Sequence, residues 1–270
     1  MLENPRSPRV RSVAKLTKRS ARAETGLYLL EGPQAVREAL TYSPEAIVEL
    51  FATHAGWEKH PDIRAKATDA DIDVEYVTEY VLNAMADTVT PQGIVAVVRQ
   101  TPMSVRDIFA AGPRLIAICE EIRDPGNLGT IIRAADAAGA DAVILTGRTV
   151  DPYNPKVVRA TTGSLFHLPV SVGAELPDVI DSAHAAGLRI LAADVKGDDL
   201  LRARAEGVLA EPTAWLFGNE ARGLEDDALL LADRVLKLPI FGRAESLNLA
   251  TAASVCLYES AFAQRADAQA

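Results

Sequence analysis

Two kinds of hydrophobic pattern alternate along this chain. Short continuous apolar runs are typical of buried strands, and apolar residues at every third or fourth position are typical of amphipathic helices. The first series predicts strands near 28–30, 47–51, 72–76 and 93–99, and helices near 6–22, 33–40, 60–68 and between the last two strands. The second series predicts strands at 115–119, 142–145, 190–193, 214–217 and 235–238, and helices near 127–139, 155–162, 175–186, 223–230 and 246–265. Strands that alternate with helices indicate an α/β protein.

A proline-containing stretch at residues 100–113 separates the two series and is predicted to be a linker. We therefore expect two domains, residues 1–100 and 113–270, in keeping with about 100–200 residues per domain. One large α/β domain is the alternative. The strands of the second series are apolar throughout, which indicates burial on both faces, as in a parallel sheet.

Charge is distributed unevenly along the chain. The net charge is −9, yet residues 1–23 carry seven Lys and Arg against Glu3 alone. Such a basic arm can contact the phosphates of a nucleic acid while the rest of the protein stays acidic. The arm residues expected to bind RNA are Arg9, Arg11, Lys15, Lys18, Arg19 and Arg22. The alternative is a solvated helix without a ligand.

Composition and motifs exclude several classes. With 49% hydrophobic residues the chain is not disordered, and it has no apolar run long enough to span a membrane. The basic start lacks the apolar core of a signal peptide. The two cysteines, Cys119 and Cys256, lie in apolar runs and are expected to be buried free thiols in a reducing compartment, the cytoplasm. The sequence shows no metal-ligand spacing, no G-x-S-x-G elbow and no G-x-G-x-x-G fingerprint.

The loop after the strand at 115–119 has features of an anion site. It contains Asn127 and opens a helix whose apolar stripe includes Leu128. Arg133 follows Leu128 by five residues, about 140° around the helix, so it is predicted to point away from the core. Gly126 and Gly129 share the face of Arg133 and leave room for a ligand at the helix start, where N–H groups favour an anion. Asn127 is expected to cap the helix or to bind a ligand, and the alternative is a plain glycine-rich turn.

Two later loops carry further polar groups. In the text LFGNEARGL, Gly218 allows close backbone approach, and Glu220 lies at a strand end where a cationic partner is expected. In the text LPIFGRAESLNLATAASVCLYE, Ser246 is predicted to cap the last helix. Asn248 would then lie in the first turn of a buried helix and must have a hydrogen-bond partner in the protein or a ligand. For both loops the alternative is simple turn or cap formation.

Together the three loops resemble the three motifs of the SpoU/TrmH family of RNA ribose methyltransferases. The matching text is NLGTIIRAADAAGA, LFGNEARGL and LPIFGRAESLNLATAASVCLYE, in the family's order and spacing, within residues 113–265. The first series, with YLLEGPQAVREAL and TPQGIVAVV, is similar to the ribosomal-protein-like substrate-binding domain often fused before such catalytic domains.

The resemblance implies a C-terminal domain of the SPOUT type with a deep trefoil knot, and a homodimer. It also implies S-adenosylmethionine as cofactor, held by backbone groups, with the cofactor residues at Leu145, Thr146, Gly147, Gly218, Asn219, Ile240 and Leu249. The catalytic set that it implies is Arg133, Asn127, Glu220, Ser246 and Asn248. Because an arginine stays protonated, phosphate positioning and charge stabilisation are expected of Arg133 rather than general-base action.

The expected activity is methyl transfer to a ribose 2′-hydroxyl of structured RNA, with 23S rRNA as the expected substrate. The 2′-hydroxyl requires RNA and excludes DNA. The alternatives are a tRNA ribose methyltransferase and a non-catalytic RNA-binding assembly factor with the same fold. A nucleotide-binding metabolic enzyme is a third class, although its phosphate loop is missing.

Overall fold

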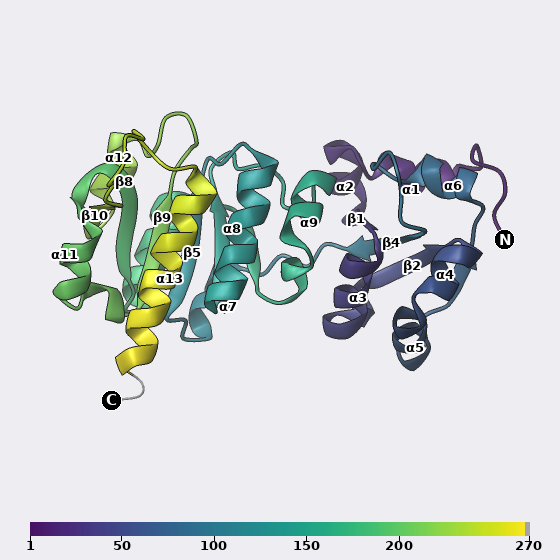
Figure 1. The fold of residues 1–270 in the computed structure, drawn as a ribbon, viewed down its shortest axis with the longest axis horizontal. Helices are drawn as coiled ribbons and strands as arrows, with labels where there is room; N and C mark the ends of the chain where they lie inside the picture. The colour runs from purple at the N-terminus through teal and green to yellow at the C-terminus, as the bar shows by residue number, and fades with distance from the viewer. Residues whose placement is uncertain (268–270) are drawn as a thin grey trace. The chain divides into compact units, whose positions relative to one another are not determined.

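The computed structural model describes residues 1–267 and divides into two compact units (Figure 1). Unit 1 comprises Met1–Thr101 and Asp151–His167, and unit 2 comprises Pro102–Val150 and the chain from Leu168 onward. Residues 268–270, which the predicted second domain includes, lie outside the described part. No helix among residues 1–267 is long and apolar enough to cross a bilayer.

Unit 1 is a four-stranded mixed sheet covered by helices. Its strands are β1 (Leu27–Glu31), β2 (Ile47–Ala52), β3 (Val74–Tyr76) and β4 (Ile94–Arg99), in the order β1-β4-β2-β3. Its helices are α1 (Pro8–Lys15), α2 (Arg19–Thr25), α3 (Pro33–Tyr42), α4 (His54–Lys59), α5 (Pro61–Asp69), α6 (Glu79–Met85) and α9 (Pro155–Thr161), with short 3-10 turns η1 (Pro44–Ala46) and η2 (Ser164–Phe166). Strand β4 is antiparallel to β1 and β2, and β2 is parallel to β3.

Side chains that point alternately to the two faces of the sheet form the two cores of unit 1. In β1, Tyr28 and Leu30 face the core that α3, α5 and α9 cover, whereas Leu29 faces the core formed with α1 and α6. This is the two-residue period of a strand buried on both faces.

Unit 2 is a six-stranded sheet in the order β10-β8-β9-β5-β6-β7. Its strands are β5 (Leu115–Glu120), β6 (Ala142–Thr146), β7 (Val170–Ala174), β8 (Arg189–Asp199), β9 (Thr213–Phe217) and β10 (Arg234–Lys237). Its helices are α7 (Val105–Ala110), α8 (Pro125–Ala138), α10 (Leu176–Ala185), α11 (Leu200–Ala205), α12 (Asp226–Leu230) and α13 (Leu249–Asp267), with a 3-10 turn η3 (Val208–Ala210). Every strand pair is parallel, so all strands end at the same edge.

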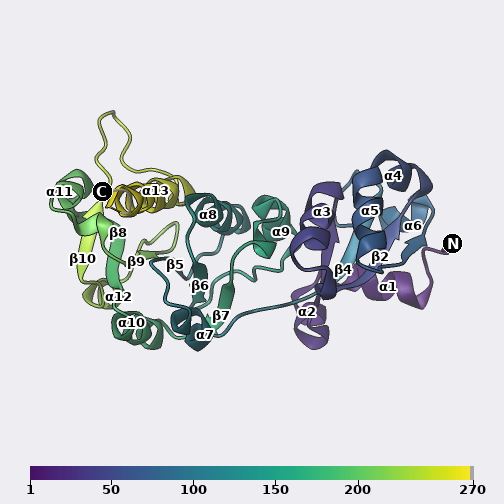
Figure 2. The same cartoon turned by 90° about the horizontal axis from the view of Figure 1, so that it is seen from below.

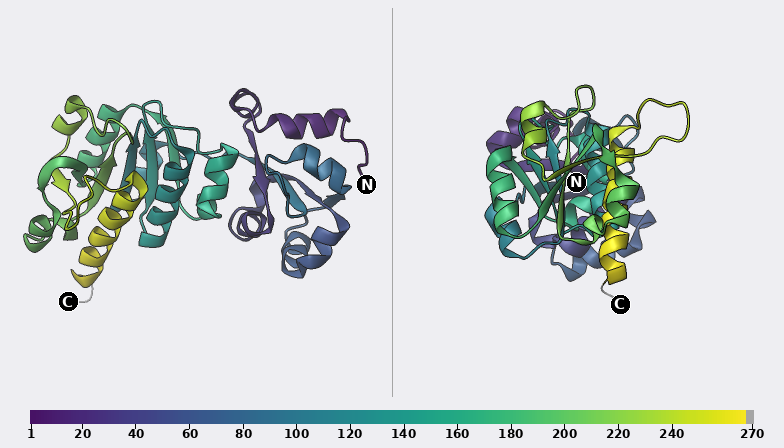
Figure 3. Two further views of the ribbon diagram at one scale, coloured as in Figure 1. Left: turned by 45° about the horizontal axis from the view of Figure 1, so that its top comes forward. Right: turned by 90° about the vertical axis from the view of Figure 1, so that its left-hand side faces the viewer.

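Helices cover both faces of this sheet. Figure 2 shows α8 and α13 side by side on one face and α7 and α10 on the other. Between β10 and α13 the chain forms a long loop, residues 238–248, which projects from the sheet edge (Figure 3). The trefoil knot expected from the resemblance stays a prediction. Cys119 and Cys256 are both buried and free, and burial raises the pKa of each thiol.

The predicted domain division differs from the structure at α9. The helix predicted near 155–162 forms, but it packs in unit 1, where Tyr153 and Val158 complete the core beside β1. An apolar helix face does not indicate which sheet it covers. The predicted linker 100–113 also contains α7, whose Ile108 is buried in the core of unit 2.

The helix predicted over 6–22 is two helices. The chain leaves helical geometry between α1 and α2, where Lys18 is extended. The Arg22 guanidinium donates to the carbonyls of Leu16 and Thr17, each at 2.9 Å, and so satisfies groups that a helix end leaves unpaired. The prediction also omitted α4, β7 and α11, which are six residues or shorter.

Candidate functional site

Four of the five predicted catalytic residues lie in three loops at the carboxyl edge of the unit 2 sheet or in the first turn of the helix that follows, and Arg133 lies further along α8. The three loops connect β5 to α8, β9 to α12 and β10 to α13. The first begins α8 with Asp124, whose carboxylate accepts the backbone N–H of Asn127 at 2.8 Å. Asp124 is therefore the helix cap, and the amide of Asn127 is available for other contacts.

A chain of hydrogen bonds joins the three loops. Asn127 Nδ2 donates to Glu220 Oε1 at 3.3 Å, and Asn248 Nδ2 donates to Asn127 Oδ1 at 2.9 Å. Glu220 also accepts the backbone N–H groups of Arg123 and Asp124, at 3.1 and 2.9 Å. Three residues that the sequence placed on separate loops are thus brought together.

Two local predictions about these loops were wrong. Glu220 was expected to face a cation, but its partners are backbone N–H groups and an amide. Ser246 was expected to cap the last helix, but α13 begins at Leu249 and Asn248 caps it, because Asn248 Oδ1 accepts the N–H groups of Ala250 and Thr251 at 2.9 and 3.2 Å. Serine and asparagine are both favoured caps, so the sequence could not decide between positions two residues apart.

Arg133 and Ser246 are the predicted catalytic residues without a partner. Arg133 lies on the exposed side of α8, as the 140° estimate requires, and its guanidinium makes no hydrogen bond or ion pair within residues 1–267. Ser246 is exposed in the loop 238–248, and its hydroxyl is likewise free among the described residues. Both side chains are available to a ligand.

A tight turn holds the predicted cofactor residues after β9. Asn219 and Gly223 exchange backbone hydrogen bonds of 3.0 and 2.8 Å, and Asn219 Nδ2 donates to the carbonyl of Glu121 at 2.8 Å. All polar groups of Asn219 therefore have protein partners, so this residue shapes the turn. At Gly218 an added Cβ would lie 2.5 Å from the carbonyl carbon of Gly223, so only glycine fits.

The other predicted cofactor residues lie along the same edge. Leu145 and Thr146 end β6 and are buried, and Gly147 follows them with φ +58°, a conformation that favours glycine. The Thr146 hydroxyl donates to Glu120 Oε2 at 2.5 Å. Leu249 begins α13 and is half-buried.

The loop before α13 offers unpaired backbone groups. Residues 238–247 make no hydrogen bond to the rest of the described chain. Ile240 in this loop is 37% exposed. Free N–H and C=O groups beside apolar side chains suit a cofactor with an apolar base and polar ends, which is the kind of group that the resemblance implies.

Two glutamates that the sequence analysis did not single out organise the end of β5. Desolvation raises the pKa of Glu120, with further increases from Glu121 and Glu175 and a decrease from the Thr146 hydrogen bond. For Glu121, desolvation is outweighed by hydrogen bonds and charges from Arg123 and Arg222, so its pKa lies below the ordinary value. Glu121 also has φ +55°, rare for a residue other than glycine and frequent near functional sites. A positive φ at a glutamate has no signal in a single sequence.

In unit 1 the basic arm is only partly available to a nucleic acid. Arg22 is 2% exposed and pairs with Asp151 at 2.7 Å, so its prediction as an RNA contact was wrong. Arg9 pairs with Glu49 and Glu75, at 2.6 and 3.3 Å. The remaining predicted arm residues are exposed: Arg11, Lys15, Lys18 and Arg19.

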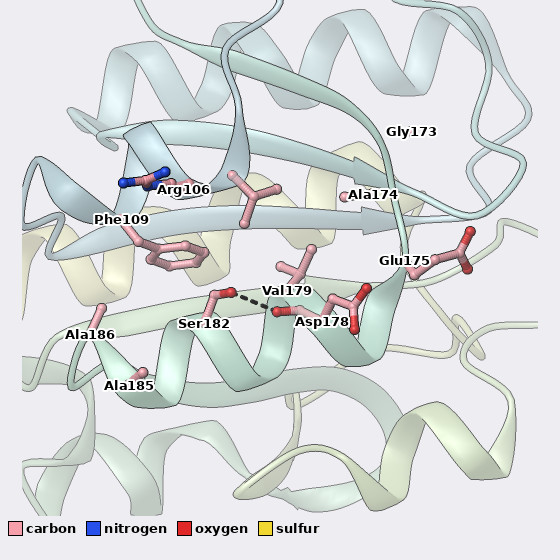
Figure 4. A pocket seen from close by; sticks show the side chains of 11 residues that line it. Arg106, Phe109, Gly173, Ala174, Glu175, Asp178, Val179, Ser182, Ala185 and Ala186 are labelled. Carbon is pink, nitrogen blue, oxygen red and sulfur yellow. Dashed lines mark hydrogen bonds between the residues drawn. The ribbon is translucent and has the colours of Figure 1, made fainter.

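A cavity of unit 2 lies beside β7, on the face of the sheet that α7 and α10 cover. It has a volume of about 660 Å³ and is formed by α7, α10 and the end of β7 (Figure 4). None of the predicted site residues lines it. Within residues 1–267 no group of three or more His, Cys, Asp or Glu is arranged to hold a metal ion.

Comparison with known proteins assigns both units. Residues 114–258 match the SpoU rRNA Methylase family, and residues 29–103 match the family described as RNA 2′-O ribose methyltransferase substrate binding. The two matches in one chain define the class, an RNA methyltransferase with separate catalytic and substrate-binding units. The first match covers more than half of the chain. This protein belongs to the SpoU rRNA Methylase family.

Individual relatives are similar over nearly the whole chain. A curated relative, the 23S rRNA (guanosine(2553)-2′-O)-methyltransferase RlmP of Bacillus subtilis (strain 168), is 33% identical over 95% of this chain and 97% of its own. An AdoMet-bound rRNA methyltransferase from Sinorhizobium meliloti is 32% identical with a TM-score of 0.81, over 96% of each chain. The SpoU methyltransferase AviRb from Streptomyces viridochromogenes, in complex with AdoMet, is 29% identical with a TM-score of 0.80, over 97% of this chain and 100% of its own.

Proposed function

We propose that this protein transfers a methyl group from S-adenosylmethionine to the 2′-hydroxyl of a ribose in 23S rRNA. The observation that carries the proposal is the hydrogen-bonded set Glu220, Asn127 and Asn248, which joins three loops. Ser246 in the third loop and Arg133 further along α8 have no side-chain partner within residues 1–267. The similarity to an rRNA 2′-O-methyltransferase and to AdoMet-bound structures supports the choice of substrate and cofactor.

The cofactor, when bound, supplies an electrophilic methyl group on a sulfonium. The residues that we expect to hold it are Leu145, Thr146, Gly147, Gly218, Ile240 and Leu249, with Asn219 acting through its turn. The tight backbone at Gly218 and the free backbone groups of residues 238–247 fit such a group. None of these roles requires a charged side chain, which suits a cofactor held by backbone groups.

The protein residues then position the ribose. Methyl transfer would form a bond between the methyl carbon and the ribose 2′-oxygen and break the bond between that carbon and the cofactor sulfur. The 2′-hydroxyl gives up its proton to solvent, so negative charge develops on its oxygen until the methyl group is bound. Arg133 remains protonated, and its guanidinium can donate to this oxygen or to a neighbouring phosphate. Asn127 and Asn248 hold each other through a 2.9 Å hydrogen bond, and the free hydroxyl of Ser246 is two residues away in the chain. We assign Arg133 to charge stabilisation and these three side chains to orientation of the ribose.

We also propose that the protein acts as a homodimer. Val255 and Phe262 lie two turns apart on α13 and are 38% and 55% exposed, an apolar strip that a second copy could cover. An rRNA substrate would place the protein in the cytoplasm. Light scattering of the parent and of Phe262→Glu tests the dimer, and a monomeric parent would refute it.

The decisive experiment is transfer of labelled methyl from S-adenosylmethionine to deproteinised bacterial 23S rRNA, with tRNA in parallel. We expect label in rRNA, in an alkali-resistant linkage that marks a 2′-O-methyl ribose. Arg133→Ala should abolish the label while cofactor binding persists, and Arg106→Ala, an exposed arginine on α7, should behave as the parent. Label only in tRNA would show that the substrate is tRNA and not 23S rRNA. No label with intact cofactor binding would favour a non-catalytic assembly factor.

A further inference from the structure

The loops of unit 2 present arginines at the edge that contains the candidate site. Five of the six strands are followed within six residues by an exposed arginine. After β8 these are Arg202 and Arg204, which pair with Glu206 and Glu259, each at 2.8 Å. The arginines after β5, β6, β9 and β10 are Arg123, Arg148, Arg222 and Arg243. Because all the strands are parallel, these loops lie at one edge of the sheet. Arg133 is separate from this group, because it lies two turns into α8, on the exposed side of that helix.

The bonding of these side chains leaves donors free. Arg148 and Arg243 make no side-chain hydrogen bond or ion pair within residues 1–267. Arg123 and Arg222 both pair with Glu121, at 3.3 and 2.7 Å, and their side chains remain 50% and 55% exposed. A guanidinium has five N–H donors, so one carboxylate leaves several of them available.

The opposite edge of the same sheet provides a contrast. There Arg189 pairs with Glu211 at 2.7 Å, and Arg234 pairs with Glu206 at 2.6 Å. Arg114, at the same edge, donates to the carbonyl of Ala210 at 3.5 Å. Arg148 and Arg243, which have no ion pair within residues 1–267, lie on the edge that holds the candidate site, whereas Arg189 and Arg234 on the opposite edge are paired with carboxylates.

The carboxylates near the site differ in how much of this positive charge they can neutralise. Asp124 caps α8 and Glu220 accepts two backbone N–H groups, so both carboxylates are directed into the protein. Glu225 pairs with Arg222 at 3.0 Å. Exposed carboxylates also lie at this edge: Glu245 next to Arg243, Glu175 after β7, and Asp226 and Asp227 at the start of α12, of which Asp226 pairs with Lys196 at 3.1 Å.

We propose that Arg123, Arg148, Arg222 and Arg243 bind the phosphates that flank the target ribose. This inference rests on the proposed function, because a ribose held at this edge brings its neighbouring phosphates to the same loops. Neighbouring strands are about 5 Å apart, so the loops after β6, β5 and β9 span about 10 Å. Guanidinium forks bind phosphate oxygens with two parallel hydrogen bonds, and they provide the local positive field that a protein of net charge −9 lacks overall.

The test is binding of fluorescein-labelled 23S rRNA fragments to the full chain, followed by anisotropy over a series of salt concentrations. Arg148→Ala and Arg243→Ala remove exposed side chains that make no hydrogen bond or ion pair within residues 1–267, so folding should be preserved. We expect each to weaken binding several-fold and to reduce the slope of log K against log salt by about 0.7–0.9. The double variant should lose about twice as much slope, and Arg148→Lys should retain the parent slope. Cofactor affinity should not change, because neither side chain is assigned to the cofactor.

The matched control is Arg189→Ala, which removes an exposed arginine from the opposite edge. Its slope should equal that of the parent. A parent slope in Arg148→Ala and Arg243→Ala would overturn the inference, as would an equal loss in Arg189→Ala, because net charge alone would then explain the effect. Absence of methyl transfer by the parent would refute the proposed function. The salt dependence of RNA binding tests the role of the arginines separately, because it does not require methyl transfer.

Discussion

The two units of this protein contrast in how their sequences relate to their chemistry. In unit 2 the predicted residues come from loops that follow parallel strands, and the structure joins three of them by hydrogen bonds. In unit 1 the predicted residues come from a run of positive charge, and the structure buries one of them and pairs another with acidic side chains. A loop after a parallel strand has its position fixed by the fold, because every such strand ends at the same edge. A run of charge has no such constraint.

The direction of each side chain in the arm depends on packing. Val10, Val13 and Leu16 of the arm are buried, so that segment is part of the core of unit 1. Arg22 lies on the covered side of α2 and completes the end of α1. Counting charges therefore overestimates a binding surface wherever the same segment also supplies core residues.

The largest expected effect is on stability, and it tests whether Arg22 of unit 1 is a structural residue rather than an RNA contact. Arg22→Ala leaves Asp151 without its partner and two carbonyls without a donor, so we expect a loss of about 3–5 kcal/mol in the free energy of unfolding. Urea unfolding measures it. Arg19→Ala, an exposed neighbour, should change stability by less than about 0.5 kcal/mol. Normal stability together with weaker RNA binding in Arg22→Ala would restore this residue to the RNA surface.

A second substitution tests the backbone of unit 2. In Gly218→Ala the new methyl group would meet the backbone of Gly223 at 2.5 Å, so the turn must open. Because displacements of about 1 Å at a site can cost 10²-fold in rate, we expect about a hundredfold loss of methyl transfer. Leu230→Ala is the control, since Leu230 is 83% exposed on α12 and lies outside the residues assigned to the cofactor. Equal activity in the two variants would show that the turn does not hold the cofactor.

A smaller effect separates the two roles of Asn248. Asn248→Ala removes both the cap of α13 and the hydrogen bond to Asn127, so stability should fall by about 1 kcal/mol and methyl transfer should also fall. Asn248→Asp keeps a capping oxygen but loses the amide donor. The aspartate variant should therefore unfold at the same temperature as the parent but have a lower kcat. Full activity in that variant would reduce Asn248 to a structural cap.

The smallest effect concerns the carboxylate at the end of β5. The pKa of Glu120 is raised, chiefly by desolvation, so the folded state favours its protonated form. Its stabilising contribution is complete below the ordinary pKa and is lost as pH rises through the raised value. Glu120→Gln cannot titrate, so its stability advantage should grow from about pH 4 to pH 7 and remain below about 1 kcal/mol, because Glu120 is half exposed. If the difference between the urea midpoints of the parent and Glu120→Gln stays constant across that pH range, the raised pKa of Glu120 is contradicted.

Most strands and helices could be predicted because their apolar runs are long. β5 and β9 are buried at nearly every position, and such runs have no other stable place than a covered sheet. β7 was missed because only its first two residues are buried, so its pattern resembles a loop. The placement of α9 in unit 1 depends on contacts between residues far apart in the chain, such as Tyr153 with Tyr28, whose ring centroids are 4.9 Å apart.

In the candidate site, too, features set by local geometry could be predicted and those set by distant contacts could not. Arg133 was correctly expected on the exposed side of its helix, because helical geometry alone determines that direction. The partner of Glu220 was not predicted, because backbone N–H groups leave no mark in a sequence. Glu121 was missed for a related reason: its role depends on a positive φ and on two arginines from different loops.

The discontinuity of unit 1 has a consequence for the order in which the protein can assemble during synthesis. The chain leaves this unit after Thr101 and returns only at Asp151. Translation of the intervening residues and of 151–167, at roughly 5–20 residues per second, takes several seconds. During that time the growing chain holds Arg22 without its carboxylate and β1 without the cover of α9. The first unit to emerge from the ribosome can therefore be completed only after residues 102–150 of the second unit have been made.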